Sequence, residues 1–202
     1  MEKNLTVSIS NGNSKMGKIP SVSLPPVVTC AEHCTCAKKC YAAKLCRIYK
    51  TVREAYGRNL EILTNDPDNY WKQVEDVVSV SRFFRFHVSG DIPNYEYLLR
   101  LVDVARNNEH CEMLAFTKRY SWVNKLLDSG VVLPSNLHIL FSEWDGMTME
   151  NPHNMPVAHV IFKGEEPLEN WNICPGNCLE CAKNHVNCWA LKQNEHVAFY
   201  EH

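Results

Sequence analysis

A chain of 202 residues in which 45% are hydrophobic is long enough to bury one sizeable core, so disulfides are not needed for folding. Its formal net charge of −2 gives no broad attraction to nucleic acid or to an anionic membrane. The amino end has no apolar stretch typical of a secretory signal, and no apolar run approaches the roughly 20 residues that cross a bilayer. We therefore expect a cytoplasmic protein with no membrane partner.

The chain is expected to form a single domain over residues 1–202. Its parts are an extended N-terminal arm, a first Cys-rich segment, a β/α core and a second Cys-rich segment, at 1–29, 30–46, 82–164 and 174–189.

The arm should be extended because Pro25 and Pro26 are consecutive prolines, which exclude helix. A helical pattern then runs from about residue 37 to 56, with Gly57 placed to end it. Asp66-Pro67 is a typical start for the next helix.

An alternation of strand and helix follows. Strands are predicted at 83–88, 113–117, 137–142 and 157–162, and helices at 93–107 and 121–128. This order predicts an α/β fold with a parallel sheet and right-handed crossovers. Too few units are visible for an eight-stranded barrel, so we expect a partial (β/α) barrel or an open, mostly parallel sheet with Cys-rich metal-binding segments at both ends. The second Cys-rich segment follows the last predicted strand, so a fold that joins the chain ends would place both segments on one rim.

Eight of the ten cysteines form two quartets. The first quartet is Cys30, Cys34, Cys36 and Cys40, and the second is Cys174, Cys178, Cys181 and Cys188. Reduced thiols grouped this closely are typical of metal sites. Cys36 and Cys40 would share one face if the segment were helical.

Two metal chemistries fit these quartets. Zinc takes four thiolates in a tetrahedron, whereas iron–sulfur clusters take cysteines from close, irregular spacings. The spacing favours one or two iron–sulfur clusters, most simply 4Fe–4S, with zinc as the alternative. His33, His185 and Cys46 stay open as further ligands, although solvated histidines and a small buried thiol are the commoner outcomes. Cys111 is interpreted as a buried thiol that enters a strand.

Polar residues follow the predicted strands, where parallel sheets bind their ligands. Ser89, Gly90, Asp91, Thr117 and Lys118 are the predicted cofactor-binding residues, with Asp91 and Lys118 as catalytic candidates. The alternative is that they are ordinary polar loop starts.

Alternation within the first strand also places Arg85, His87 and Ser89 on one face. His138 and His159 fall in buried register within the later strands.

A set of short motifs occurs in one order along nearly the whole chain: Asn13-Ser14-Lys15-Met16-Gly17, Ser23-Leu24-Pro25-Pro26, Thr29-Cys30, Cys36-x3-Cys40-Tyr41-Ala42, His87-Val88-Ser89-Gly90-Asp91, Thr117-Lys118 and Cys188-Trp189. This set resembles the phage-associated gene product 88 family. Cys34 is additional to that pattern.

More distantly, the order resembles a shortened radical S-adenosylmethionine enzyme. The first quartet lacks the C-x3-C-x2-C spacing of that superfamily, but Cys174, Cys178 and Cys181 have it. The resemblance implies that an iron with an open position cleaves S-adenosylmethionine reductively, with Gly90 and Asp91 holding its polar end and Lys118 on its carboxylate or on the substrate. The functional prediction is an iron–sulfur protein with a pocket at the strand ends, whose partners are a small-molecule ligand or a reductant protein. The alternatives are a non-catalytic, zinc-stabilised binding module of phage origin and an electron-transfer protein.

Overall fold

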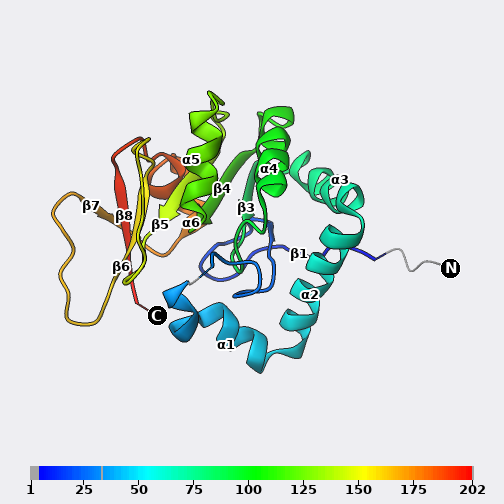
Figure 1. Ribbon diagram of the computed structural model, residues 1–202, viewed down its shortest axis with the longest axis horizontal. Coiled ribbons are helices and arrows are strands. Elements are labelled where there is room, and N and C mark those ends of the chain that lie inside the picture. The colour runs from blue at the N-terminus through cyan, green and yellow to red at the C-terminus, as the bar shows by residue number, and fades with distance from the viewer. Residues whose placement is uncertain (1–4, 33, 202) are drawn as a thin grey trace.

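The computed structural model describes residues 5–32 and 34–201. Its centre is an eight-stranded sheet in the order β1-β2-β3-β4-β5-β6-β8-β7 (Figure 1). β1 runs antiparallel to β2, and every other neighbouring pair is parallel. The strands are Ile9–Ser10, Ser21–Val22, Phe83–Phe86, Glu112–Thr117, Leu137–Ser142, Val157–Ile161, Trp171–Ile173 and His196–Tyr200, from β1 to β8. Because the order ends at β1 and β7, the sheet is open, and a partial barrel is not confirmed.

Helices connect and cover these strands. The α-helices are Tyr41–Ile48, Lys50–Asn65, Pro67–Val78, Tyr95–Asn107, Tyr120–Asp128 and Cys178–Asn184, from α1 to α6. Two short 3₁₀ helices, η1 and η2, are Thr35–Lys39 and Asn187–Trp189. Side-chain caps define several starts: the Asp66 carboxylate accepts from the Asn69 amide at 3.2 Å before α3, with Pro67 at the first turn.

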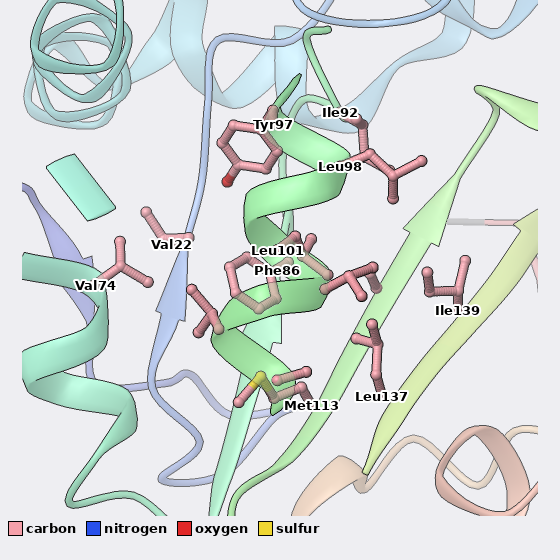
Figure 2. Close-up of a cluster of buried hydrophobic side chains, with 14 of the residues drawn as sticks. Val22, Val74, Phe86, Ile92, Tyr97, Leu98, Leu101, Met113, Leu137 and Ile139 are labelled. Atoms are coloured by element: carbon pink, nitrogen blue, oxygen red, sulfur yellow. The ribbon is translucent and has the colours of Figure 1, made fainter. Parts of the chain in front are cut away.

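The two faces of the sheet are buried differently, since side chains alternate along each strand. On one face Phe84, Phe86 and Met113 pack against residues of α3, α4 and α5. Figure 2 shows Phe86, Met113, Leu137 and Ile139 of the strands around Leu98 and Leu101 of α4. On the other face, residues such as Leu114 and Leu140 pack against Trp189 and α6. The second Cys-rich segment therefore covers the face opposite to the main core.

The helix predicted over residues 37–56 is wrong in its bounds. The segment instead forms η1, α1 and the first part of α2, because Cys40 and Tyr49 both take extended backbone angles. Gly57 lies inside α2 rather than at its end, and an added Cβ there would meet no atom within 4 Å. Cys36 and Cys40 consequently do not share a face of one helix.

The chain ends contribute more to the sheet than the sequence pattern indicated. The N-terminal arm supplies β1 and β2, and it buries Leu24 completely. The second Cys-rich segment does not follow the last strand but lies between β7 and β8. The predicted β/α core at 82–164 is thus extended by strands on both sides.

In the described part of the chain, no helix is both long enough and apolar enough to cross a membrane.

Candidate functional site

One cavity of about 550 Å³ brings the two quartets together. All eight quartet cysteines line it, and each carries a free thiol. We call this space the cysteine cavity. It extends from the carboxyl ends of β3, β4 and β5, at Ser89, Thr117 and Ser142, across the sheet face that carries Arg85 and Leu114.

The first quartet lies on irregular backbone between β2 and α1. Cys34 precedes η1, Cys36 lies within it, and Cys40 is the N-cap of α1. The Cys40 thiol accepts a hydrogen bond from the Ala43 amide at 3.4 Å. The second quartet surrounds α6: Cys174 follows β7, Cys178 and Cys181 lie on the helix, and Cys188 lies in η2.

Arg119 anchors the first quartet to the sheet. Its guanidinium donates to the carbonyls of Ile92 at 3.1 Å, Thr29 at 3.2 Å and Cys30 at 2.7 Å. The sequence offered no signal for this role, because the three accepting groups are backbone atoms from distant segments.

Asp91 joins the ends of β3 and β4. Its carboxylate accepts from the Ile92 amide at 2.7 Å, the Thr117 hydroxyl at 2.6 Å and the Lys118 amide at 2.8 Å. The side chain is only 4% exposed, and burial raises the pKa of its carboxyl although these hydrogen bonds oppose the shift. Asp91 lines the cavity, but internal donors already occupy its oxygens.

Gly90 is required by close packing against the arm. Its φ is +78°, and an added Cβ would lie 2.6 Å from Thr29 Oγ1 and 2.8 Å from the Leu24 carbonyl oxygen. A glycine is therefore needed here whether or not a ligand approaches the backbone.

Each quartet faces one cation from the sheet. Burial raises the pKa of the Cys178 and Cys188 thiols, and the charge of Arg85 opposes that shift; Lys118 likewise favours the thiolate forms of Cys34 and Cys36. Arg85 Nη1 lies 3.9 Å from Cys178 Sγ, and its buried Nε has no hydrogen-bond partner within the described residues. Neither Arg85 nor Lys118 forms an ion pair with a carboxylate of residues 5–32 or 34–201. The sequence placed Arg85 only on one face of the first predicted strand, with His87 and Ser89.

Burial and neighbouring thiols oppose these cations. A hydrogen bond from Cys36 is the main cause that lowers the pKa of Cys34 to about 6, while the same bond and burial raise the pKa of Cys36. Burial raises the pKa of Cys30 to about 11 and that of Cys188 to about 12.

Among the described residues, no three His, Cys, Asp or Glu side chains are already arranged around a single ion position. His33 lies outside the described residues. His185 is exposed at the left-handed C-cap of α6, and Cys46 is half-buried rather than in the core. Cys111 is fully buried in the main core and does not line the cavity, as expected for a thiol that enters a strand.

Two of the histidine predictions need correction. His87 does not share a face with Arg85, because its φ of 57° ends the alternation of β3 and brings its Nε2 within 3.0 Å of Tyr97 Oη on α4. His138 is half-buried and pairs with Glu112 at 2.7 Å. His159 is buried as predicted.

His159 belongs to a polar chain that the sequence did not indicate. Its Nδ1 contacts the Glu143 carboxylate, and its Nε2 lies 2.9 Å from Nδ1 of His196. The ring stacks on Trp171 with centroids 4.0 Å apart. Burial lowers the pKa of His159, against the effect of Glu143.

A family model described as gene product 88 matches residues 2–200. The chain belongs to the gene product 88 family. No curated protein and no solved structure matches this gene product 88 chain. The family match covers both quartets and all eight strands, so the cysteine cavity lies wholly within the matched region.

Proposed function

We propose that this gene product 88 protein holds iron–sulfur cofactor through its two cysteine quartets and binds a small molecule beside it. The observation that carries the proposal is the meeting of eight free thiols, from two distant segments, on one cavity. A structural role for the thiols alone would not require them to face a shared space of about 550 Å³.

The donor set fits a thiolate-bound cluster in residue type and in charge. Four thiolates around an iron–sulfur core carry net negative charge, and burying it requires compensation. Arg85 supplies one positive charge beside the second quartet, and Lys118 supplies one beside the first, where the nearby Asp91 carboxylate partly offsets it. When bound, a cluster would supply one-electron redox chemistry.

The remaining wall of the cavity suits a small-molecule ligand. Lys118 Nζ donates to the Ser142 hydroxyl at 2.6 Å and lies 5.9 Å from the Trp144 ring centroid, so a cation, a hydroxyl and an aromatic surface occur together. We propose that Lys118 binds an anionic group of that ligand. Ser89 and Thr117 line the same end of the cavity.

S-adenosylmethionine cleavage remains a prediction from the distant resemblance. The internal hydrogen bonds of Asp91 and the tight packing of Gly90 account for both residues without that ligand.

A second candidate is a zinc-stabilised binding module. Cys178 and Cys181 lie three residues apart on α6, as in a zinc knuckle, and this spacing favours zinc for the second quartet. Zinc there would stabilise the segment that covers the sheet and would add no redox chemistry.

Absorption spectra of protein purified without oxygen would test the proposal. We expect a brown protein whose visible absorption bleaches on reduction and falls in the variants Cys40→Ser and Cys181→Ser. Cys111→Ser is the matched control, because this thiol is buried outside the cavity, and it should keep the colour. A colourless wild type that retains zinc would favour the second candidate.

A further inference from the structure

The outer face of α1 carries an exposed apolar stripe. Tyr41, Leu45 and Ile48 follow the i, i+4, i+7 spacing that places residues on one side of a helix. Their exposed fractions are 49%, 38% and 58%. Ala42 is the buried residue of this helix, about a quarter turn away from the stripe. Leu45 and Ile48 therefore lie outside the core that their own chain provides, whereas the Tyr41 side chain reaches back to the Val88 carbonyl.

Basic residues flank this stripe along the chain, although Lys39 pairs with Glu201 and Lys50 pairs with Glu54. Six basic residues and no acidic residue occur from position 38 to 53, in a chain whose formal charge is −2. They are Lys38, Lys39, Lys44, Arg47, Lys50 and Arg53. Lys44 and Arg47 are exposed beside the stripe. Within the residues that the structure describes, neither forms an ion pair with a carboxylate. We call Tyr41, Leu45, Ile48, Lys44 and Arg47 the α1 surface.

The α1 surface adjoins the first quartet. Cys40 is the N-cap of α1, and the next residue, Tyr41, belongs both to the stripe and to the wall of the cysteine cavity. The Tyr41 hydroxyl donates to the Val88 carbonyl at 2.6 Å, which holds this ring against the strand end. A molecule seated on α1 would thus lie one side chain away from the cavity. In Figure 1, α1 lies at the lower rim of the molecule, below the sheet.

We propose that the α1 surface docks an acidic electron-transfer protein that reduces the cofactor of the first quartet. This inference rests on the proposed function. An apolar centre with a charged rim is the ordinary anatomy of a transient protein interface. The excess of lysine and arginine selects an acidic partner and accelerates its encounter.

The aliphatic centre favours a protein over a nucleic acid. Single-stranded nucleic acids bind to basic grooves through aromatic rings on which bases stack. Here two of the three stripe residues, Leu45 and Ile48, are aliphatic, and the hydroxyl of Tyr41 is engaged with Val88. The redox step is an outer-sphere transfer: one electron leaves the reduced carrier, which is oxidised by one unit, and the cofactor is reduced by one. No bond forms or breaks.

A plant-type [2Fe–2S] ferredoxin, an acidic carrier of low potential, is a suitable probe. Its photoreduced form would be mixed with the full-length protein without oxygen, and the second-order rate of cofactor reduction would be followed at low salt. We expect Arg47→Glu and Ile48→Ser each to lower this rate by about tenfold or more, and the deficit of Arg47→Glu to shrink as salt is raised. The exposed Lys72 on α3 supplies the matched charge-reversal control, Lys72→Glu, which should leave the rate unchanged.

Dithionite reduction and iron content of the same variants separate docking from cofactor loss, because both should remain at wild-type values. Rates that are unchanged by Arg47→Glu and Ile48→Ser would overturn the docking proposal. So would oligothymidine binding that these substitutions abolish while ferredoxin reduction is unaffected.

Calorimetric titration of oxidised ferredoxin gives a readout that needs no cofactor. Binding that disappears in the α1 variants, from a protein without iron, would overturn the proposed function but retain the docking surface. No binding to the wild type would overturn the docking surface whatever the iron content.

Discussion

Gly90→Ala is expected to disturb both stability and the first quartet. The new methyl group would lie 2.6 Å from Thr29 Oγ1 and 2.8 Å from the Leu24 carbonyl oxygen, and one of these obstacles is backbone. Relief requires the arm to move away from the end of β3. The arm leads directly into Cys30, so this movement would carry the first quartet away from the sheet.

A matched glycine separates backbone strain from steric conflict. Gly130 has a φ of +82°, close to the +78° of Gly90, but an added Cβ there meets no atom within 4 Å. Gly130→Ala should therefore cost only the left-handed conformation of alanine, about 1–2 kcal/mol. For Gly90→Ala we expect that cost plus about 1–3 kcal/mol from the contact with the arm.

Urea unfolding of both variants, with metal content determined on the same samples, measures the difference. Gly130→Ala should retain the wild-type metal content, whereas Gly90→Ala should lose metal from the first quartet. Equal free energies of unfolding for the two variants would refute the account of Gly90 as a packing glycine.

Three further predictions concern residues outside the quartets. Asn136→Asp should lower the free energy of unfolding, measured by urea titration, by about 3 kcal/mol or more. The buried Asn136 amide nitrogen donates to three carbonyls, and in the variant these carbonyls would face a carboxylate. An unchanged free energy of unfolding would contradict this prediction. Arg119→Met should lower the free energy of unfolding by about 1–3 kcal/mol and speed hydrogen exchange of the backbone amides around Cys30, since three carbonyls lose their donor. Exchange that speeds up equally along the whole chain would argue against an anchoring role for Arg119. Burial lowers the pKa of His87 from its ordinary 6.5 to about 3. Between pH 6.5 and pH 3 this imidazole is therefore protonated in the unfolded protein and neutral in the folded protein. Stability should therefore fall below pH 6.5, by up to about 1.4 kcal/mol per pH unit from this residue, and His87→Gln should flatten that slope in urea titrations.

The central strands were predictable because each contains a dense apolar run of ordinary length. Strands 113–117 and 137–142 agree with β4 and β5 to within a residue. The strands at the chain ends were not predictable in the same way. β1, β2 and β7 contain only two or three residues, and such short segments acquire their conformation by pairing with a neighbour.

The candidate site was predictable in its members but not in its construction. The quartets and the polar strand ends could be found from spacing, and both line the same cavity. The internal role of Asp91 could not be found, because its donors include the backbone amides of Ile92 and Lys118. The position of Arg85 beside Cys178 could not be predicted either, because it depends on how α6 packs across the sheet.

Iron, zinc and acid-labile sulfide counted per chain, in protein prepared without oxygen, give the most direct test of the account. We predict iron and sulfide in near-equal amounts, with zinc well below one equivalent. Protein that folds fully yet contains no metal would contradict the proposal that thiols from both ends of the chain hold an inorganic cofactor.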